Sequence, residues 1–595
     1  MRYRRWYVVA LLAMAGVISA EELHVGDFGA VGDGVHDDGP ALRAVFAAAS
    51  KAGTPCTISF EGTKTYYIAP HDEANGRLLL REASNVTVQG HGAMLIVHPP
   101  NRALGVYRSR NVRLRDLRID YRPVPYVQGT ITNIDNESGL LEFEPHPRYL
   151  PPVEGDESLY KDGRNEDSVT FNHETNKFYH AHCRVREVKA LGNGRFRVSY
   201  RGHRFTEARL GDYFAMKNRW GPRTGLRNAD ARDLSRKNEY VTTADASISI
   251  VHSNNVVLDN IHSYASPGMT VNTRGCHDLV IRGLQIRRCN GRLVAGCSDG
   301  IHIKCNESPP VIQDCHIEAT MDDSIHIKIS GDWITEVASP RRVRIRHMDI
   351  AWDNTNLGPG KRVMAYDHDR NRELATATII EYEPIDHRHG WVTLDRDIPE
   401  LSVNDSFYLE AEGEAIIERC QFGTQLQRAV LTHQPTVIRD CTIEDNGQGI
   451  VVGFGGAIEG PPSQRLRVER CRFTRLKRRA IYVQCPSKDY DQKGDPQFIC
   501  TESVFRLPEG SPAFHVINSQ GVALRNNRYY YAEHKPSLDE YLIFDNSPLR
   551  EDHGNVFVES GVYPPVSLFD GCRSAILFRH SRGWESHIRS TPPAK

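Results

Sequence analysis

The sequence predicts an all-β fold, a right-handed parallel β-helix (solenoid) with two inserted small antiparallel β-barrel domains. Short strands of alternating polar and apolar residues recur at spacings of 20 to 33 residues, with Gly and Asn between them. Such a period is typical of a chain whose turns stack as rungs. Two long stretches break the period and resemble each other, which indicates inserted domains.

Composition bounds the possible classes. The chain has 595 residues, 39% of them hydrophobic and 25% charged, with a formal net charge of -1. These values exclude a disordered, collagenous or integral membrane protein. A balanced charge gives no electrostatic reason to expect nucleic acid or an anionic membrane as a partner. We expect a large soluble globular protein whose oligomeric state the sequence leaves open.

Residues 1–20 have the pattern of a secretory signal peptide. Three arginines lie among the first five residues, an apolar run follows over 7–18, and small residues precede Glu21. Cleavage after Ala20 would give a secreted or periplasmic protein with no membrane span. An uncleaved anchor is the alternative, although about a dozen apolar residues are too few to cross a bilayer comfortably.

Residues 21–125 are predicted to form an N-terminal cap and the first rungs. The segment 27–42, rich in Gly and Asp, leads into apolar residues at helical spacing, with Asp38 as an N-cap candidate and Pro40 early in the helix. A helix here would close the open end of the solenoid.

The two inserts are predicted at 126–220 and 336–412. Gly129-Thr-Ile-Thr-Asn-Ile in the first parallels Ala377-Thr-Ile-Ile-Glu-Tyr in the second, and the two end in similar Asp-X-Phe segments. We interpret them as small β-barrels, with long loops as the alternative. Residues 221–335 would then carry the active-site rungs and 413–595 the C-terminal rungs.

Cysteines recur at one position of the repeat. The chain has 13 cysteines, and five of them share a context in which an acidic or basic residue precedes the cysteine: Cys289, Cys315, Cys420, Cys441 and Cys471. This pattern is more typical of small buried side chains stacked in a ladder than of a disulfide framework. The disulfide status of the cysteines stays open.

Three carboxylates fall on the two rungs that match best. Asp299-Gly-Ile-His-Ile-Lys304 and Asp323-Ser-Ile-His-Ile-Lys328 align at an offset of 24 residues. Since rungs stack about 4.8 Å apart, Asp299 and Asp323 should lie one above the other, with Asp322 beside them. Clustered carboxylates repel each other, so at least one of them holds its proton more tightly than a free Asp does.

Such a set suits hydrolysis of a glycosidic bond, which needs one protonated carboxyl and one ionised carboxylate. Strand alternation points the isoleucines inward and a polar floor for sugar hydroxyls outward. That floor consists of His302, Lys304, His326 and Lys328, and the preceding rung adds Asn272 and Arg274 as candidates for substrate binding.

Several readings stay open beside this one. The aspartates could be turn formers or calcium ligands, although we expect neither a metal nor a cofactor. Trp333 either stacks on a sugar face or packs in the protein. His180 and His182, in the first insert, form a weak metal motif without a fourth ligand nearby in sequence, so structural roles are favoured there.

The motifs also resemble known families. The segment from Asp27 resembles the opening of pectin-degrading β-helix enzymes. Ser298-Asp299-Gly300 followed by Asp322-Asp323 resembles the polygalacturonase layout and, more closely, glycoside hydrolase family 110, the exo-acting α-1,3-galactosidases of blood-group-B-type and linear α-galactosyl glycans. This resemblance implies a glycan substrate, the fold given above, and no cofactor.

By the same resemblance Asp322 would be the general acid, and Asp299 and Asp323 the pair that activates water, with inversion at the anomeric carbon. An inverting site needs roughly 6.5 to 9.5 Å between acid and base. The Gly-His-Gly and Arg-Ile-Lys elements of polygalacturonases do not follow Lys328, which disfavours a uronic acid. The alternatives are a β-helix hydrolase of another glycan, a polysaccharide lyase, or a carbohydrate-binding β-helix without catalysis. Whether fucosylated or linear acceptors are preferred stays open.

Overall fold

The computed structural model describes most of the chain after the predicted signal peptide, which lies outside the described residues. These are residues 21–595 without 71–77, 100, 153, 155–166, 203–204, 218–245, 348–356, 371, 387, 411, 454–458, 462–464, 486–496, 509–510, 532–540, 546, 560–576, 580–586 and 589–595. Within these residues, no helix has both the length and the apolar character needed to cross a membrane.

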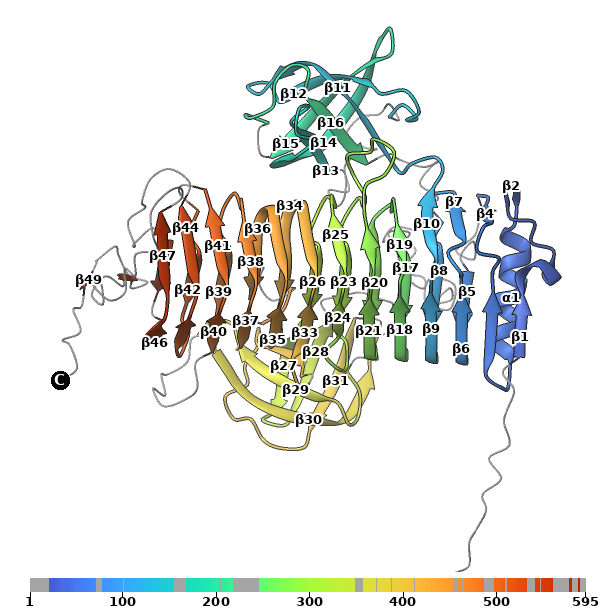
Figure 1. Ribbon diagram of the computed structural model, residues 1–595. Helices are drawn as coiled ribbons and strands as arrows, with labels where there is room; N and C mark the ends of the chain where they lie inside the picture. The colour runs from blue at the N-terminus through green and yellow to red at the C-terminus, as the bar shows by residue number, and fades with distance from the viewer. Residues whose placement is uncertain are drawn as a thin grey trace, which may run out of the picture.

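The strands stack into a long parallel solenoid, which confirms the predicted fold (Figure 1). The first of its three faces is one sheet of parallel strands. In stacking order these are β1 (Glu21–His24), β3 (Cys56–Ser59), β6 (Ser84–Gln89), β9 (Arg110–Arg115), β18 (Asn254–Asp259), β21 (His277–Arg282), β24 (Val311–Gln313), β33 (Ala415–Glu418), β35 (Thr436–Arg439), β37 (Leu466–Glu469), β40 (Phe498–Thr501), β43 (Val522–Arg525) and β46 (Leu549–His553).

The second face stacks in the same direction. Its strands are β2 (Asp33–Asp37), β4 (Thr65–Ile68), β7 (Met94–Val97), β10 (Arg118–Tyr121), β19 (His262–Ser263), β22 (Gln285–Ile286), β25 (His316–Glu318), β34 (Gln421–Thr432), β36 (Thr442–Val452), β38 (Arg472–Thr474), β41 (Val504–Leu507), β44 (Arg528–Tyr531) and β47 (Val556–Glu559).

The third face carries the residues of interest. Its strands are β5 (Leu78–Arg81), β8 (Leu104–Tyr107), β17 (Ala246–Val251), β20 (Met269–Arg274), β23 (Ile301–Lys304), β26 (Ile325–Lys328), β39 (Ile481–Gln484), β42 (Phe514–Ile517), β45 (Leu542–Asp545) and β48 (Leu577–Arg579), with β49 (His587–Ile588) antiparallel to the last. Between β26 and β39 the long strands β34 and β36 continue from the second face into the third and join the two.

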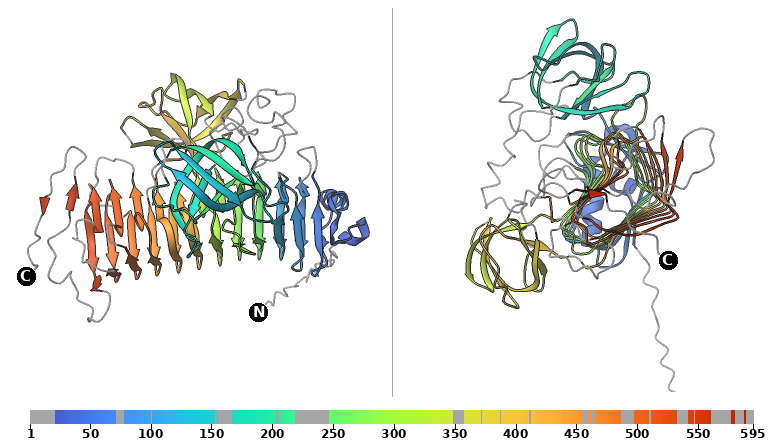
Figure 2. Two further views of the ribbon diagram at one scale, coloured as in Figure 1. Left: turned by 90° about the horizontal axis from the view of Figure 1, so that it is seen from above. Right: turned by 90° about the vertical axis from the view of Figure 1, so that its left-hand side faces the viewer.

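Two closed antiparallel barrels interrupt the solenoid, as predicted. The first contains β11 (Tyr126–Asp135), β12 (Leu140–Pro145), β13 (Asp167–Phe171), β14 (Phe178–Gly192), β15 (Arg195–Gly202) and β16 (Tyr213–Lys217). The second contains β27 (Asp332–Ser339), β28 (Arg342–His347), β29 (Arg362–Asp367), β30 (Arg372–Pro384), β31 (His389–Leu394) and β32 (Ser406–Leu409). Seen along the solenoid axis, the two barrels project from different sides of the solenoid (Figure 2).

The second barrel begins earlier than the sequence predicted. Asp332 already pairs with Phe407 and Trp333 with Ser406, across the barrel seam. Residues 332–335 therefore belong to the barrel and not to the active-site rungs. The strand pattern runs into the barrel almost directly after Lys328, so the sequence shows no break at the boundary.

A helix closes the N-terminal end of the solenoid. A 3-10 helix, η1 (Val25–Phe28), precedes α1 (Gly39–Lys51), which buries its apolar residues on the first rungs. Asp38 occupies the N-cap position, but its carboxylate accepts the backbone N–H groups of Val31 and Gly32 instead of capping the helix. The predicted cap residue thus fixes the preceding loop.

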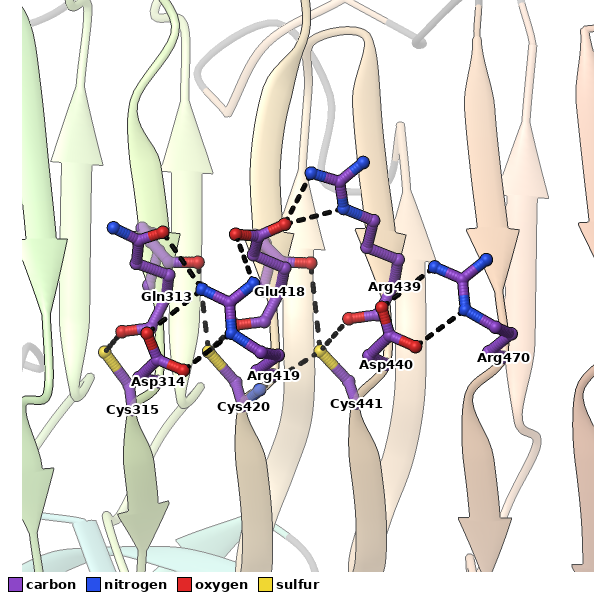
Figure 3. A network of polar contacts seen from close by, with 12 residues as sticks. Gln313, Asp314, Cys315, Glu418, Arg419, Cys420, Arg439, Asp440, Cys441 and Arg470 are labelled. Atoms are coloured by element: carbon purple, nitrogen blue, oxygen red, sulfur yellow. Dashed lines mark hydrogen bonds and ion pairs between the residues drawn. The ribbon is translucent and has the colours of Figure 1, made fainter.

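The predicted cysteine ladder occupies the corner between the first and second faces. Each described cysteine is a free thiol. At successive corners the Sγ atoms donate to the carbonyl oxygen two residues back, at 3.2 to 3.4 Å: Cys315, Cys420, Cys441 and Cys471. Figure 3 shows this ladder beside outward ion pairs such as Arg419 with Asp314. The prediction that Cys289 belongs to this ladder was wrong. Leu284 occupies the corner of that rung, and Cys289 lies after β22.

Candidate active site

The in-register strands β20, β23 and β26 align the polar floor in two columns. Asn272, His302 and His326 form one column, since each pairs with the next across the sheet. Arg274, Lys304 and Lys328 form the second column in the same way. The isoleucines between them are buried in the solenoid, which confirms the predicted alternation.

The aspartates of the two matched rungs are stacked as predicted. The Gly300 N–H donates to the carbonyl oxygen of Asp323 at 2.9 Å, and the Asp323 N–H donates to Asp299 Oδ1 at 3.1 Å. One carboxylate oxygen each from Asp299, Asp322 and Asp323 lies within 4.8 Å of the others. The three carboxylates therefore form one cluster at the same edge of the sheet.

The three carboxylates differ in exposure. The side chains of Asp299 and Asp323 are only 4% and 2% exposed. Asp322 is half-buried, and its loop is held by Thr320 Oγ1, which donates to the Asp322 carbonyl oxygen at 3.2 Å, and by the Gln425 amide. Asp322 is thus the carboxylate with most access from outside.

His302 keeps Asp299 ionised. The Nδ1 atom of His302 lies 2.5 Å from Asp299 Oδ2. Burial lowers the pKa of His302 to about 4, so the ring is neutral near pH 7 and donates its Nδ1 hydrogen. Burial raises the pKa of Asp299, but the hydrogen bonds from His302 and from the Asp323 N–H act against burial, and the net pKa lies below its ordinary value.

Asp323 is held from the next rung by Arg428, a residue that sequence reasoning missed. The Arg428 NH1 atom lies 3.0 and 2.7 Å from the two Asp323 oxygens, and the Arg428 N–H donates to Oδ1 at 3.1 Å. Burial still leaves the pKa of Asp323 above its ordinary value, against the lowering effect of Arg428. In the structure β26 and β34 pair Ile325 with Val430, so Arg428 occupies the Asp323 position of the following rung.

Glu459 is a second functional residue that the sequence did not reveal. Its Oε2 lies 3.3 Å from His326 Nε2 and 3.3 Å from Lys328 Nζ. Burial raises the pKa of Glu459, but His326 and Lys328 lower it by more, so the carboxylate is ionised. It comes from the segment after β36, outside any strand pattern, and no motif pointed to it.

The other predicted binding residues differ in burial and in position. Asn272 is half-buried and Arg274 is buried. Burial and the charges of Arg274 and Lys328 hold the pKa of Lys304 well below its ordinary value. Trp333 lies in β27 with its ring 4.8 Å from that of His368, so the structure places it in the packing of the second barrel. This contact favours the packing alternative.

The structure bears on two possible metal sites. His180 and His182 lie in β14, but their side chains fall outside the described residues. Donor atoms of Asp299, His302 and His326 also lie within 4.8 Å of one another, a set that could hold a cation. Here the short hydrogen bond to His302 already occupies Asp299 Oδ2.

Gly300 lies where the two aspartate-bearing rungs approach each other closely. A Cβ atom at this position would lie 2.6 Å from the Ser324 carbonyl oxygen and 2.9 Å from Ile317 Cγ2. We expect Gly300→Ala to lower the free energy of unfolding by about 1–3 kcal/mol and the activity by at least about tenfold, because the rungs must separate. Urea unfolding and initial rates would measure both effects.

Gly296 provides the matched control for this change. A Cβ atom there would lie 3.3 Å from Thr270 Oγ1 and 3.4 Å from Thr320 Cγ2, contacts that small shifts relieve. Gly296→Ala should therefore retain most of the stability and activity. Equal losses in the two variants would show that the close approach at Gly300 has no special importance.

Buried neutral histidines make stability depend on pH. The pKa values of His302 and His433 are lowered by burial to about 4 and about 3, whereas an unfolded imidazole titrates near 6.5. The unfolded chain therefore binds more protons below about pH 6.5, and each ring should lower stability by about 1.4 kcal/mol per pH unit between there and its folded pKa. Urea unfolding at pH 7, 6 and 5 would measure the slope. His433→Gln should flatten it, and an unchanged slope would contradict this account.

The chain is similar to proteins of known name. No family model matches the chain. Alpha-1,3-galactosidase B of Bacteroides thetaiotaomicron is 23% identical over 412 residues, which cover 66% of this chain and 62% of that protein. Alpha-1,3-galactosidase A of Bacteroides fragilis is 20% identical over 609 residues, which cover 95% and 93%. The match thus spans less than two thirds of the first relative and almost all of the second.

Two solved structures with a similar fold have low identity. The family 28 exopolygalacturonase of Yersinia enterocolitica has a TM-score of 0.41 and 11% identity, covering 92% of this chain and 77% of the other. The tailspike protein of an E. coli bacteriophage in complex with a pentasaccharide has a TM-score of 0.41 and 9% identity, covering 90% and 67%. The sequence relatives carry the name alpha-1,3-galactosidase, and the chain is similar to them at modest identity.

Proposed function

We propose that the protein is a secreted or periplasmic exo-glycosidase that hydrolyses terminal, non-reducing α-1,3-linked galactose with inversion. The observation that carries the proposal is the convergence of three carboxylates, two of them buried and one accessible, on adjacent rungs. Hydrolysis of a glycosidic bond needs both a carboxyl that donates a proton and a carboxylate that acts as base, and this cluster supplies both groups. The names of the relatives supply the sugar and the linkage.

Asp322 is the general acid of the proposed mechanism. It is the most accessible carboxylate of the three, and a protonated Asp322 would donate its proton to the leaving oxygen as the glycosidic C–O bond breaks. Asp299 and Asp323 bind the attacking water. Its oxygen forms the new bond to the anomeric carbon, and its proton passes to this carboxylate pair.

Burial of the base pair supports inversion. At 4% and 2% exposure, Asp299 and Asp323 can contact a water molecule, whereas an anomeric carbon cannot come within bonding distance of either oxygen. Arg428 also occupies both oxygens of Asp323. The short distance between the carboxylates points the other way, since retaining enzymes place them about 5–5.5 Å apart. The anomer that is released first therefore decides between the two outcomes.

The polar columns suit the hydroxyl groups of a hexose. His302 and His326 have rings 4.6 Å apart, and each ring presents nitrogen atoms in the same column as Asn272. Lys328 is paired with Glu459, which leaves this part of the site less cationic than its sequence suggested. A neutral galactose fits these groups without an unpaired charge.

A panel of substrates tests the linkage and the sugar. We expect release of galactose from galactose-α-1,3-galactose at least about 100-fold faster than from the α-1,4-linked isomer or lactose, because a misplaced leaving oxygen loses the proton of Asp322. A blood group B trisaccharide in the same panel shows whether a fucosylated acceptor is accepted. Release from every linkage at similar rates would contradict the proposal.

A polygalacturonase-like hydrolase is the second candidate, because the column of Arg274, Lys304 and Lys328 contains a guanidinium group that could bind a uronate. Tetragalacturonate tests it in the same panel. Cleavage of tetragalacturonate with no release from the α-1,3-linked disaccharide would replace the first candidate with this one.

A further inference from the structure

A second cavity lies far from the carboxylates, where the N-terminal helix meets the third face. It has a volume of about 510 Å³, with Arg43, Ala47 and Lys51 of α1 on one wall and Leu79 and Arg81 of β5 on the other. The side chains from α1 share one face of that helix, at spacings of four residues. The cavity is thus formed by the outer face of the cap helix and the outer face of the first rungs.

The two walls are fixed to each other. Ser50 Oγ accepts the backbone N–H of Arg81 at 3.2 Å and donates to the Phe46 carbonyl oxygen at 2.8 Å. Leu78 and Leu80 are fully buried in the solenoid, so Leu79 and Arg81 point outward between them. The cavity walls are therefore set by regular secondary structure.

The cavity is cationic. Arg43, Lys51 and Arg81 line it against a single acid, Glu82. Among the described residues, none of these three cations forms an ion pair. The Arg81 guanidinium lies 4.9 Å from the Tyr107 ring centre, which holds it in place without neutralising its charge.

The cavity also shares a sheet with the active site. Strand pairing aligns Arg81 with Tyr107, Tyr107 with Val251, Val251 with Arg274, and Arg274 with Lys304. Four rungs at about 4.8 Å place it roughly 19 Å from the His302 rung, along the same face. An extended oligosaccharide can span that distance with its terminal sugar at the carboxylates.

We propose that this cavity is an anchoring site for an acidic saccharide unit, one that carries a sulfate ester or a carboxylate. Guanidinium groups bind either anion in a bidentate manner, and Lys51 adds a third positive charge. Ala47 and Leu79 present an apolar floor to the C–H groups of a sugar ring, and the volume suits a small ligand. The role of the anchor, to hold the acceptor end of a substrate, rests on the proposed function.

Calorimetric titration of the full chain tests the binding itself. The probes are an oligosaccharide of sulfated galactose units, tetragalacturonate and a neutral galactotetraose. The test variant is Arg81→Gln with Lys51→Gln. The matched control is Arg113→Gln with Lys189→Gln, which removes one exposed arginine and one exposed lysine elsewhere. Unfolding midpoints of both variants would establish that the fold is kept.

We expect one of the acidic probes to bind, and the test variant to bind it about tenfold more weakly than the control variant and the wild type. Binding should weaken as salt is added. The probe that binds more tightly identifies the sulfate or the carboxylate. Failure of both acidic probes to bind, or equal affinity in the two variants, would overturn the proposal.

The catalytic proposal is tested separately, by hydrolysis of galactose-α-1,3-galactose, which is too short to reach the cavity. Both double variants should hydrolyse this disaccharide at the wild-type rate. If the test variant binds the acidic probe more weakly than the control but no variant hydrolyses the disaccharide, the anchoring site is supported and the proposed activity is wrong. If the disaccharide is hydrolysed but the test and control variants bind the acidic probes equally, the proposed activity is supported and the anchoring site is wrong.

Discussion

Asp322→Asn is expected to lower kcat on galactose-α-1,3-galactose by about 100-fold to 10,000-fold. Asparagine has nearly the same shape as aspartic acid but carries no acidic proton, so the sugar leaving group would depart as an alkoxide. Asp322 is half-buried and its loop is held through its carbonyl oxygen, which the substitution keeps. The free energy of unfolding should therefore change little.

An activated substrate separates a general acid from other roles. A dinitrophenyl α-galactoside has a leaving group that departs without protonation, so Asp322→Asn should retain activity on it to within about tenfold. Asp278→Asn is the matched control, because Asp278 is exposed and distant from the site, with a positive φ that asparagine accepts. A loss of the same size on both substrates would show that Asp322 does not protonate the leaving group.

Arg428→Gln is expected to have the largest combined effect on stability and rate. The substitution leaves the Asp323 carboxylate, which is 2% exposed, without the guanidinium group that contacts both of its oxygens. Breaking a buried ion pair in this way costs about 3–5 kcal/mol of the free energy of unfolding. The pKa of Asp323, already raised by burial, should rise further.

The direction of the pH effect follows from the role of the base. Asp323 must be ionised to bind and activate water, so a higher pKa moves the acidic limb of the kcat/KM profile to higher pH. Arg428→Lys should keep the positive charge but lose the planar guanidinium group, and the acidic limb of its profile should lie between those of Arg428→Gln and the wild type.

Arg470 supplies a matched control for Arg428. Its bidentate partner Asp440 is exposed on the outside of the solenoid, so Arg470→Gln should change stability by less than about 1 kcal/mol and leave the profile unmoved. A wild-type pH profile in Arg428→Gln would mean that Asp323 does not serve as a base.

The repeat explains why much of the site could be predicted. Asp299-Gly-Ile-His-Ile-Lys304 and Asp323-Ser-Ile-His-Ile-Lys328 match so closely that their register follows from the sequence, and the period-2 alternation then orients the histidines and lysines. A rung spacing near 4.8 Å places the aspartates together without further information. The structure confirms each of these steps.

The residues that were missed come from outside that repeat. Arg428 follows a whole inserted barrel, and its strand β34 crosses from the second face to the third instead of stopping at the corner, so no motif aligns it with Asp323. Glu459 lies beyond any strand and meets His326 only through the winding of the chain. Contacts of this kind depend on the path of loops in three dimensions, which the strand repeat does not encode.

Loop paths limit prediction in the same way. The sequence leaves open whether Trp333 stacks on a sugar or packs in the protein, and strand pairing with Ser406 places it in the second barrel. The lateral position of the loop that carries Asp322 does not follow from the repeat either. Spacing along a rung is predictable, whereas the path of a turn is not.

The most direct test of the central claim is a proton NMR time course on galactose-α-1,3-galactose, which identifies the first anomer of galactose that is released. The buried base pair predicts β-galactose before mutarotation, since water bound by Asp299 and Asp323 attacks the face opposite the leaving group. α-Galactose as the first product would contradict the account, because one of these carboxylates would then have to act as a nucleophile.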